Sequence, residues 1–149
     1  MKVWQKFIVA GILLGGQSSV VLAQNDEAEV KSAINRLFEA MLKSDSAGVV
    51  DAFWPGATLQ SVSRSKEGKV VVQTVPITAF GGSVGRSKPG DLEERITFDA
   101  IHIDGDLASV WTPFEFFLRN KFSHKGTNSF QVVRKEGLWK IQYIIDTRK

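Results

Sequence analysis

The sequence predicts an α+β fold, a cone-shaped curved antiparallel sheet wrapped around a long N-terminal helix. Two observations support this. Apolar residues recur with helical spacing between residues 28 and 43, whereas residues 93–147 alternate between apolar and polar as strands do. Helices and strands that are segregated along a chain are typical of α+β proteins. The sheet needs a cover for its apolar face, and the helix offers a matching stripe. The mouth of such a cone is the natural place for a pocket.

The first 23 residues have the layout of a secretory signal peptide. Two lysines precede an apolar run over residues 7–16, and Val21 and Ala23 are small residues at the positions that a signal peptidase reads. We expect cleavage after Ala23 and a single domain over 24–149. The protein would then be exported, periplasmic or secreted, with no stable membrane insertion. An N-terminal anchor is the alternative, although the run is shorter than the ~20 apolar residues of a spanning helix.

Composition excludes several classes of function. The 149 residues include no cysteine, which rules out disulfides, thiolate metal sites and a cysteine nucleophile. The net charge of +3 falls to +1 when the signal lysines leave, and a nucleic-acid binder should carry a clustered basic face instead. We therefore expect no nucleic-acid partner. A metal site at His102 and Asp104 would need more ligands, and neither a cysteine nor a third histidine is available, so we expect no metal and no cofactor.

Two helices are predicted at the start of the mature chain. Asn25 and Asp26 are cap-type residues before an amphipathic helix that ends near Lys43. Its apolar stripe comprises Val30, Ile34, Leu37, Phe38, Met41 and Leu42. Asp45 can cap a second, short helix, which Pro55-Gly56 stops.

The middle of the chain is harder to interpret. Strands are predicted over 58–62 and 69–75, and Pro76 could open a short helix. Three glycines between 81 and 85 weaken that helix and favour a mobile loop near the mouth. The stretch lacks the Gly-Lys-Ser/Thr close of a phosphate loop.

The last third predicts four strands, over 93–104, 107–119, 127–135 and 138–147. Asp104-Gly105 is a strong hairpin signal, Pro113 indicates a bulge or an edge, and residues 120–126 are predicted to turn the chain. On the final strand, alternation would place Trp139, Ile141, Tyr143 and Ile145 on one face.

The mature chain resembles the nuclear transport factor 2-like superfamily, in the secreted branch named lumazine-binding. The resemblance rests on residues 28–43, Asp51-Ala52-Phe53-Trp54, Ser123-His124-Lys125-Gly126, Gly137-Leu138-Trp139-Lys140-Ile141 and Asp146-Thr147-Arg148. It implies a cone-shaped barrel that often forms homodimers through its sheet. The superfamily includes ketosteroid isomerases, dehydratases, SnoaL-like cyclases and many members without known chemistry, and the fold does not determine function.

His124 and Asp146 are the candidate catalytic pair. His124 is predicted in a turn near four phenylalanines, where it could serve as a general base or bind a ligand, since its ordinary pKa is near neutrality. The alternative is an exposed turn histidine. Asp146 could orient His124, or brace the C-terminus with Arg148.

Three further residues are candidates for ligand binding. Trp54 lies at a predicted helix end beside Pro55, and Trp111 is one of several aromatics that could line a pocket or pack in the core. Glu115 could acquire a raised pKa if its side chain enters the cone, or it could form a surface ion pair with Arg119.

Three functions are consistent with these residues. The first is an exported domain, with or without catalysis, that binds a small, partly aromatic molecule and forms a homodimer. The second is a cofactor-independent enzyme for isomerisation, dehydration or cyclase-type proton transfer, with His124 as the base. The third is a protein-interaction module that uses the outer sheet face; it predicts a closed cavity and an exposed apolar face.

Overall fold

The computed structural model describes residues 17–149, and most of the predicted signal segment lies outside the described residues. The elements are α1 (Gln17–Leu42), α2 (Ser46–Asp51), β1 (Phe53–Arg64), β2 (Val70–Val75), α3 (Ile77–Gly85), β3 (Leu92–Ile96), β4 (Ala100–Asp104), β5 (Leu107–Leu118), β6 (Lys121–Lys135) and β7 (Leu138–Arg148). Within this part of the chain, no helix is both long enough and apolar enough to cross a membrane.

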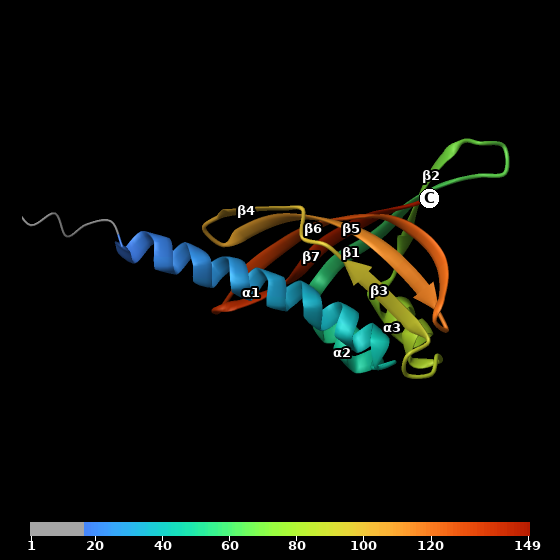
Figure 1. Cartoon of the computed structure of the whole chain (residues 1–149), viewed down its shortest axis with the longest axis horizontal. Helices are drawn as coiled ribbons and strands as arrows, with labels where there is room; N and C mark the ends of the chain where they lie inside the picture. The colour runs from blue at the N-terminus through green and yellow to red at the C-terminus, as the bar shows by residue number, and fades with distance from the viewer. Residues whose placement is uncertain (1–16) are drawn as a thin grey trace, which may run out of the picture.

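The strands form one curved sheet in the order β2-β1-β7-β6-β5-β3, and β4 continues beyond β3 on the same side of β5. Figure 1 shows α1 lying along the sheet, with α2 and α3 gathered at one end. The predicted α+β cone is confirmed, with one correction. β1 pairs in parallel with β7, so the sheet is mixed rather than wholly antiparallel. Alternation within a strand carries no information about the direction of its neighbour.

The long helix packs its predicted stripe against the sheet. Val30, Ile34 and Leu37 are fully buried, and Phe38 meets Phe130 of β6 edge to face at 6.2 Å between ring centroids. Burying four such side chains stabilises the fold by about 6–12 kcal/mol before conformational entropy is subtracted.

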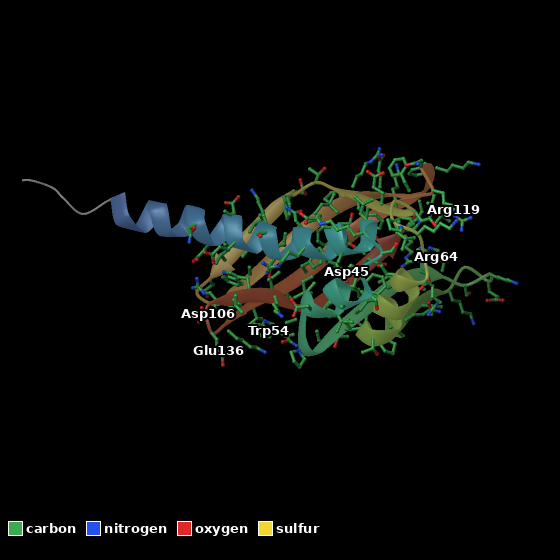
Figure 2. All side chains as sticks on the ribbon, turned by 90° about the horizontal axis from the view of Figure 1, so that it is seen from below. Asp45, Trp54, Arg64, Asp106, Arg119 and Glu136 are labelled. Carbon is green, nitrogen blue, oxygen red and sulfur yellow. The ribbon has the colours of Figure 1, made fainter. Side chains whose placement is uncertain are left out.

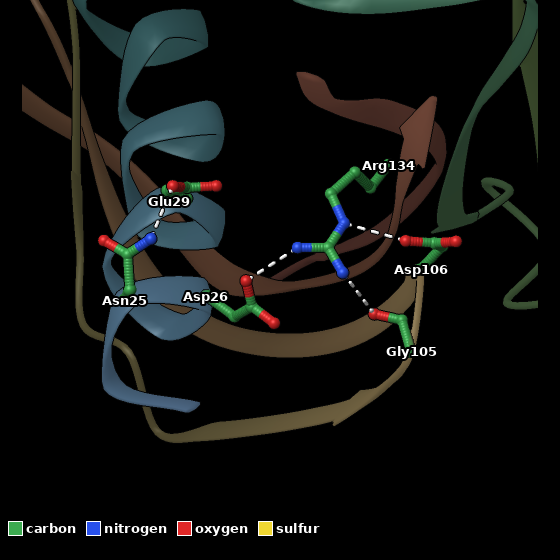
Figure 3. A network of polar contacts seen from close by, with 6 residues as sticks. All are labelled: Asn25, Asp26, Glu29, Gly105, Asp106 and Arg134. Atoms are coloured by element: carbon green, nitrogen blue, oxygen red, sulfur yellow. Dashed lines mark hydrogen bonds and ion pairs between the residues drawn. The ribbon is translucent and has the colours of Figure 1, made fainter. Parts of the chain in front are cut away.

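The start of α1 corrects the predicted cap. No glycine or proline interrupts residues 17–47, and the helix therefore runs through Asn25 and Asp26 instead of beginning there. Asp26 accepts a hydrogen bond from Arg134 of β6 at 2.7 Å, and Arg134 also pairs with Asp106 at 2.7 Å (Figure 3). The guanidinium thus ties α1 to the turn between β4 and β5.

The glycine-rich segment is part of helix α3, not a loop. A Cβ atom on Gly81 would lie 3.0 Å from the carbonyl oxygen of Ser46, and one on Gly85 would lie 2.9 Å from the Ser46 Cβ atom. The glycines therefore let α3 approach α2 at backbone distance. Asp45 caps α2 as predicted, accepting from the Gly48 N–H at 2.9 Å.

Strand β5 continues through Pro113 without a bulge at that residue, and the interruption lies in the neighbouring strand instead. The predicted strand over 93–104 is broken between β3 and β4, where the Pro113 carbonyl accepts from the Thr97 N–H at 3.0 Å. A residue's N–H and C=O point to the same neighbour in an antiparallel pair, so the donor that proline lacks falls at this break. The irregularity in β5 lies instead between Phe116 and Phe117.

The turn between β5 and β6 is shorter than predicted. Arg119 and Asn120 have φ angles of 52° and 62° and join Leu118 to its partner Lys121 directly. Residues 121–126 consequently belong to β6. His124 lies in a strand opposite Phe116, not in a turn.

A bulge in β7 reverses the predicted faces of its second half. Val132 pairs with Ile141 and Gln131 with Tyr143, so Gln142 has no partner in the register. One extra residue flips the alternation. Ile144 and Asp146 therefore join Trp139 and Ile141 on the inner side, and Tyr143 and Ile145, predicted there, face outward.

Candidate functional site

A cavity of about 350 Å³ lies inside the cone, between the C-terminal half of α1, α3 and the sheet. Most of its wall is apolar, formed by Leu37, Phe38, Met41, Leu59, Val75, Ala79, Phe80, Val84, Leu92, Phe114, Phe116 and Ile144. The polar lining residues are Ser61, Ser83, Glu94, His124, Asn128, Asp146 and Arg148. Cavities of this size hold small organic molecules, and a few convergent polar groups set their orientation.

Asp146 is held by neighbours on two sides. Its Oδ1 atom accepts a short hydrogen bond from the Ser61 hydroxyl of β1, the strand paired with β7. The Arg148 Nε atom lies 3.6 Å from the same oxygen. The Asp146 side chain is only 12% exposed and that of Arg148 is 56% exposed, so the arginine marks the solvent side of the pair. Of the two roles that the sequence leaves open for Asp146, the contact with Arg148 is therefore present in the structure.

Glu94 is a site residue that sequence reasoning missed. It comes from β3, and its Oε1 atom accepts a hydrogen bond from Nδ2 of the buried Asn128 at 2.8 Å. Burial raises the pKa of Glu94 to about 7. The negative charge of Asp146 adds to this, whereas Asn128 and Arg148 oppose it. A carboxyl group in this state exchanges its proton near neutral pH.

His124 lies on the same cavity wall between two phenylalanine rings. Its ring centroid is 5.1 Å from that of Phe116 and 5.9 Å from that of Phe114. Burial lowers its pKa, with Arg148 adding to the effect and Asp146 opposing it. The lowered pKa favours the neutral imidazole, and its Nδ1 atom is 3.1 Å from the Ser123 hydroxyl. His124 and Asp146 thus share a cavity, while the hydrogen bond of His124 goes to Ser123.

Gly126 allows these groups to converge. A Cβ atom at this position would overlap the Thr147 carbonyl oxygen of β7 and lie 2.8 Å from the Phe114 ring. No side chain fits between the strands here. Asn128 and His124, two residues away on either side, therefore reach the cavity past a bare stretch of backbone.

The structure places Trp54 outside this cavity. Its indole N–H donates to the Val133 carbonyl at 2.8 Å, and the ammonium groups of Lys135 and Lys140 lie 5.1 and 5.4 Å from its ring centroid. Figure 2 shows Trp54 on the same side as Asp106 and Glu136, at the end of the sheet away from Arg119. The cause is that β1 begins at Phe53, whose side chain enters the core and turns Trp54 to the other face.

Trp111 and Glu115 lie on the outer face of β5. Their neighbours Val110, Thr112 and Phe114 are buried, and alternation turns both residues outward, leaving Trp111 47% exposed. Glu115 therefore does not enter the cone. The expected ion pair with Arg119 is wrong as well, because the Arg119 Nε atom lies 3.5 Å from Asp91.

Over residues 17–149, no three His, Asp or Glu side chains gather as metal ligands. The chemistry that the cavity residues themselves offer is hydrogen bonding and proton exchange. Glu94 can hold or release a proton near pH 7, and His124 can accept one. The Ser61 hydroxyl already donates to Asp146, whereas the Asn128 amide has a second hydrogen beyond the one it donates to Glu94.

Comparison with solved structures decides the fold. A protein of unknown function from Mycobacterium tuberculosis is 15% identical, with a TM-score of 0.71 over 91% of this chain and 78% of that one. A nuclear transport factor 2-like protein of unknown function from Shewanella baltica is 18% identical, with a TM-score of 0.66 over 85% of this chain and 95% of that one. The fold is nuclear transport factor 2-like. A nuclear transport factor 2-like protein with a cystatin-like fold, from Novosphingobium aromaticivorans, is 12% identical with a TM-score of 0.68 over 91% of this chain and 89% of that one.

The nuclear transport factor 2-like fold is thus established by structure alone. No protein-family model matches the chain, and no curated protein matches it. At such low identities the neighbours carry no information about ligand or reaction.

Proposed function

We propose that the chain is an exported small-molecule-binding protein whose ligand occupies the cone cavity. Export rests on the signal-like first 23 residues, and the secreted, lumazine-binding branch of the superfamily is the placement that the quoted sequence segments favour. One observation carries the binding role. Polar groups from β1, β3, β6 and β7 converge within an otherwise apolar cavity of about 350 Å³.

The lining defines the kind of ligand. Phe80, Phe114 and Phe116 offer aromatic surface, which suits a flat, partly aromatic body. Asn128, Glu94 and the Asp146–Arg148 pair would meet a group that both donates and accepts hydrogen bonds. We expect a small heteroaromatic or aromatic molecule with one polar edge.

Native mass spectrometry of the protein purified from its own exported fraction tests this proposal. We expect a co-purifying small molecule whose retention falls at least tenfold in Phe116→Ala, because the variant removes aromatic contact from the wall. Trp111→Ala, on the outer face, is the matched control and should retain it. Absence of any ligand, together with no stabilisation across a small-molecule thermal-shift panel, would remove the binding role.

A second candidate function, proton transfer within a bound ligand, is favoured by the pKa of Glu94. A general base works best when its pKa lies near the operating pH, and about 7 satisfies this. Glu94→Gln keeps the oxygen that Asn128 binds and removes the proton exchange. With the co-purified molecule as substrate, turnover lost at unchanged affinity would establish catalysis. Unchanged turnover would exclude Glu94 as the base.

The third candidate function, a protein-interaction module that uses the outer sheet face, has less support. It predicts a closed cavity, whereas Arg148, which lines the cavity, is 56% exposed to solvent. Trp111 on the outer face remains a surface that a partner could contact, and the homodimer stays a prediction.

A further inference from the structure

The hairpin of β1 and β2 projects from the body of the molecule, and β2 forms one edge of the sheet (Figure 1). Native proteins protect such edges with charges, prolines or bulges. Strand β2, Val-Val-Val-Gln-Thr-Val, contains none of these, and its register with β1 is regular. Val70 is 62% exposed and Val72 is 53% exposed.

The backbone bonds of the hairpin show which groups of β2 are free. The Ser65 N–H donates to the Lys69 carbonyl at 2.8 Å, so Lys69 points its backbone groups toward β1. Antiparallel strands alternate between residues that exchange hydrogen bonds with the neighbour and residues that do not. Val71, Gln73 and Val75 therefore bond to β1. The N–H and C=O groups of Val70, Val72 and Thr74 point to the open edge.

We propose that this edge pairs with β2 of a second copy of the chain, antiparallel and about a two-fold axis at Val72. Only outward-pointing residues can exchange bonds across the new pairing. The register that places Val72 opposite Val72 and Val70 opposite Thr74 gives a partner to every outward backbone group of these three residues. A register shifted toward the C-terminal end of β2 would place Pro76 of one copy, which has no N–H, opposite Val70 of the other. A register shifted toward the N-terminal end would place Thr74 opposite a residue that precedes the strand in the second copy.

The side chains fit the same register. The two copies of Val72 lie side by side on one face, next to the exposed Val70. Lys69, the charged residue that directly precedes the strand, would face Val75 of the other copy. In a parallel, in-register pairing the two lysines would face each other instead. The strand is thus complementary to itself in one orientation, which favours a second copy over a foreign peptide. The interface is small, and we expect a concentration-dependent equilibrium rather than a permanent dimer.

Engineered thiols test the register, because the chain contains no cysteine. Opposed residues in a hydrogen-bonded pair have Cα atoms about 5.5 Å apart, within disulfide range, whereas diagonal residues are about 7–8 Å apart. Val72→Cys should therefore form a cross-linked dimer at least tenfold faster than Gln73→Cys under the same mild oxidant. Gln73 is the matched control, since it is exposed on the same strand and faces Val71 of the second copy.

Sedimentation velocity on the cysteine-free protein completes the test. The wild type and Val72→Thr should show a monomer–dimer equilibrium, and Val72→Lys should weaken it at least tenfold by opposing two like charges. Circular dichroism confirms that each variant is folded. Equal cross-linking at positions 72 and 73, faster cross-linking of Trp111→Cys, or a wild type that stays monomeric throughout would overturn the proposal. The last outcome would leave a foreign strand as the occupant.

Discussion

Glu94→Gln should make the protein more stable at alkaline pH than the wild type. In the folded state the pKa of Glu94 is raised from 4.5 to about 7, chiefly by burial. The folded state therefore binds more protons than the unfolded state between these values, and its stability falls as the pH rises through this window. The difference of 2.5 in pKa, at about 1.4 kcal/mol for each, corresponds to about 3 kcal/mol.

Urea unfolding followed by tryptophan fluorescence, at pH values from 4 to 8.5, measures this effect. Below about pH 4.5 the two proteins should have similar free energies of unfolding. Above pH 7.5 the variant should be the more stable by about 3 kcal/mol, because glutamine carries no charge to desolvate and keeps the bond from Asn128. Comparing the variant with the wild type cancels the other titrating groups to first order.

Glu115→Gln provides the control on the outer face. Its difference from the wild type should stay within about 0.5 kcal/mol at every pH. If the Glu94→Gln difference is equally flat, the Glu94 carboxyl is solvated in the native protein. The assignment of burial as the cause of its raised pKa would then be refuted.

Three further predictions concern packing and capping. Thr112→Val should stabilise the protein by about 1 kcal/mol, since the buried Thr112 hydroxyl finds no partner among residues 17–149; a loss of stability on thermal unfolding would indicate a hidden partner. Gly85→Ala should cost about 1–3 kcal/mol through overlap with Ser46, whereas Gly82→Ala, with 3.7 Å to its nearest neighbour, should be neutral or stabilising; similar midpoints in urea would contradict the close approach of α3 to α2. Arg134→Ala should cost about 1–2 kcal/mol by releasing the carboxylates of Asp26 and Asp106, and hydrogen exchange should rise at the start of α1; unchanged exchange there would show that the contact is not stabilising.

Local signals predicted the fold well where one periodicity dominated. The stripe on α1, the Asp45 cap and the tight turns are all decided by residues within a few positions of one another. The same reasoning failed at residues 81–85. Glycine has a low helix propensity, but the close approach of α3 to Ser46 leaves no room for a larger side chain, so glycine is favoured within this helix. It also placed His124 in a turn, since the two-residue turn at Arg119 and Asn120 lacks the usual glycine.

The candidate site was predicted in part. His124 and Asp146 do reach one cavity, but Asp146 does so only because the bulge at Gln142 reverses the faces of β7. Glu94 was missed because nothing adjacent to it in the sequence indicates burial. Its partner Asn128 lies 34 residues away on β6.

The sequence by itself determined the order of the first two helices and of the last three strands, the apolar stripe of α1 and the absence of thiol chemistry, because each of these depends on composition or on neighbours along the chain. Tertiary structure alone decided the parallel pairing of β1 with β7, the bulge, and the meeting of Glu94, Asn128, Ser61 and Asp146. These features depend on contacts between strands far apart in the chain. Periodicity indicates which face of a strand is apolar, but not which strand lies beside it or which charged side chain lies across the cavity.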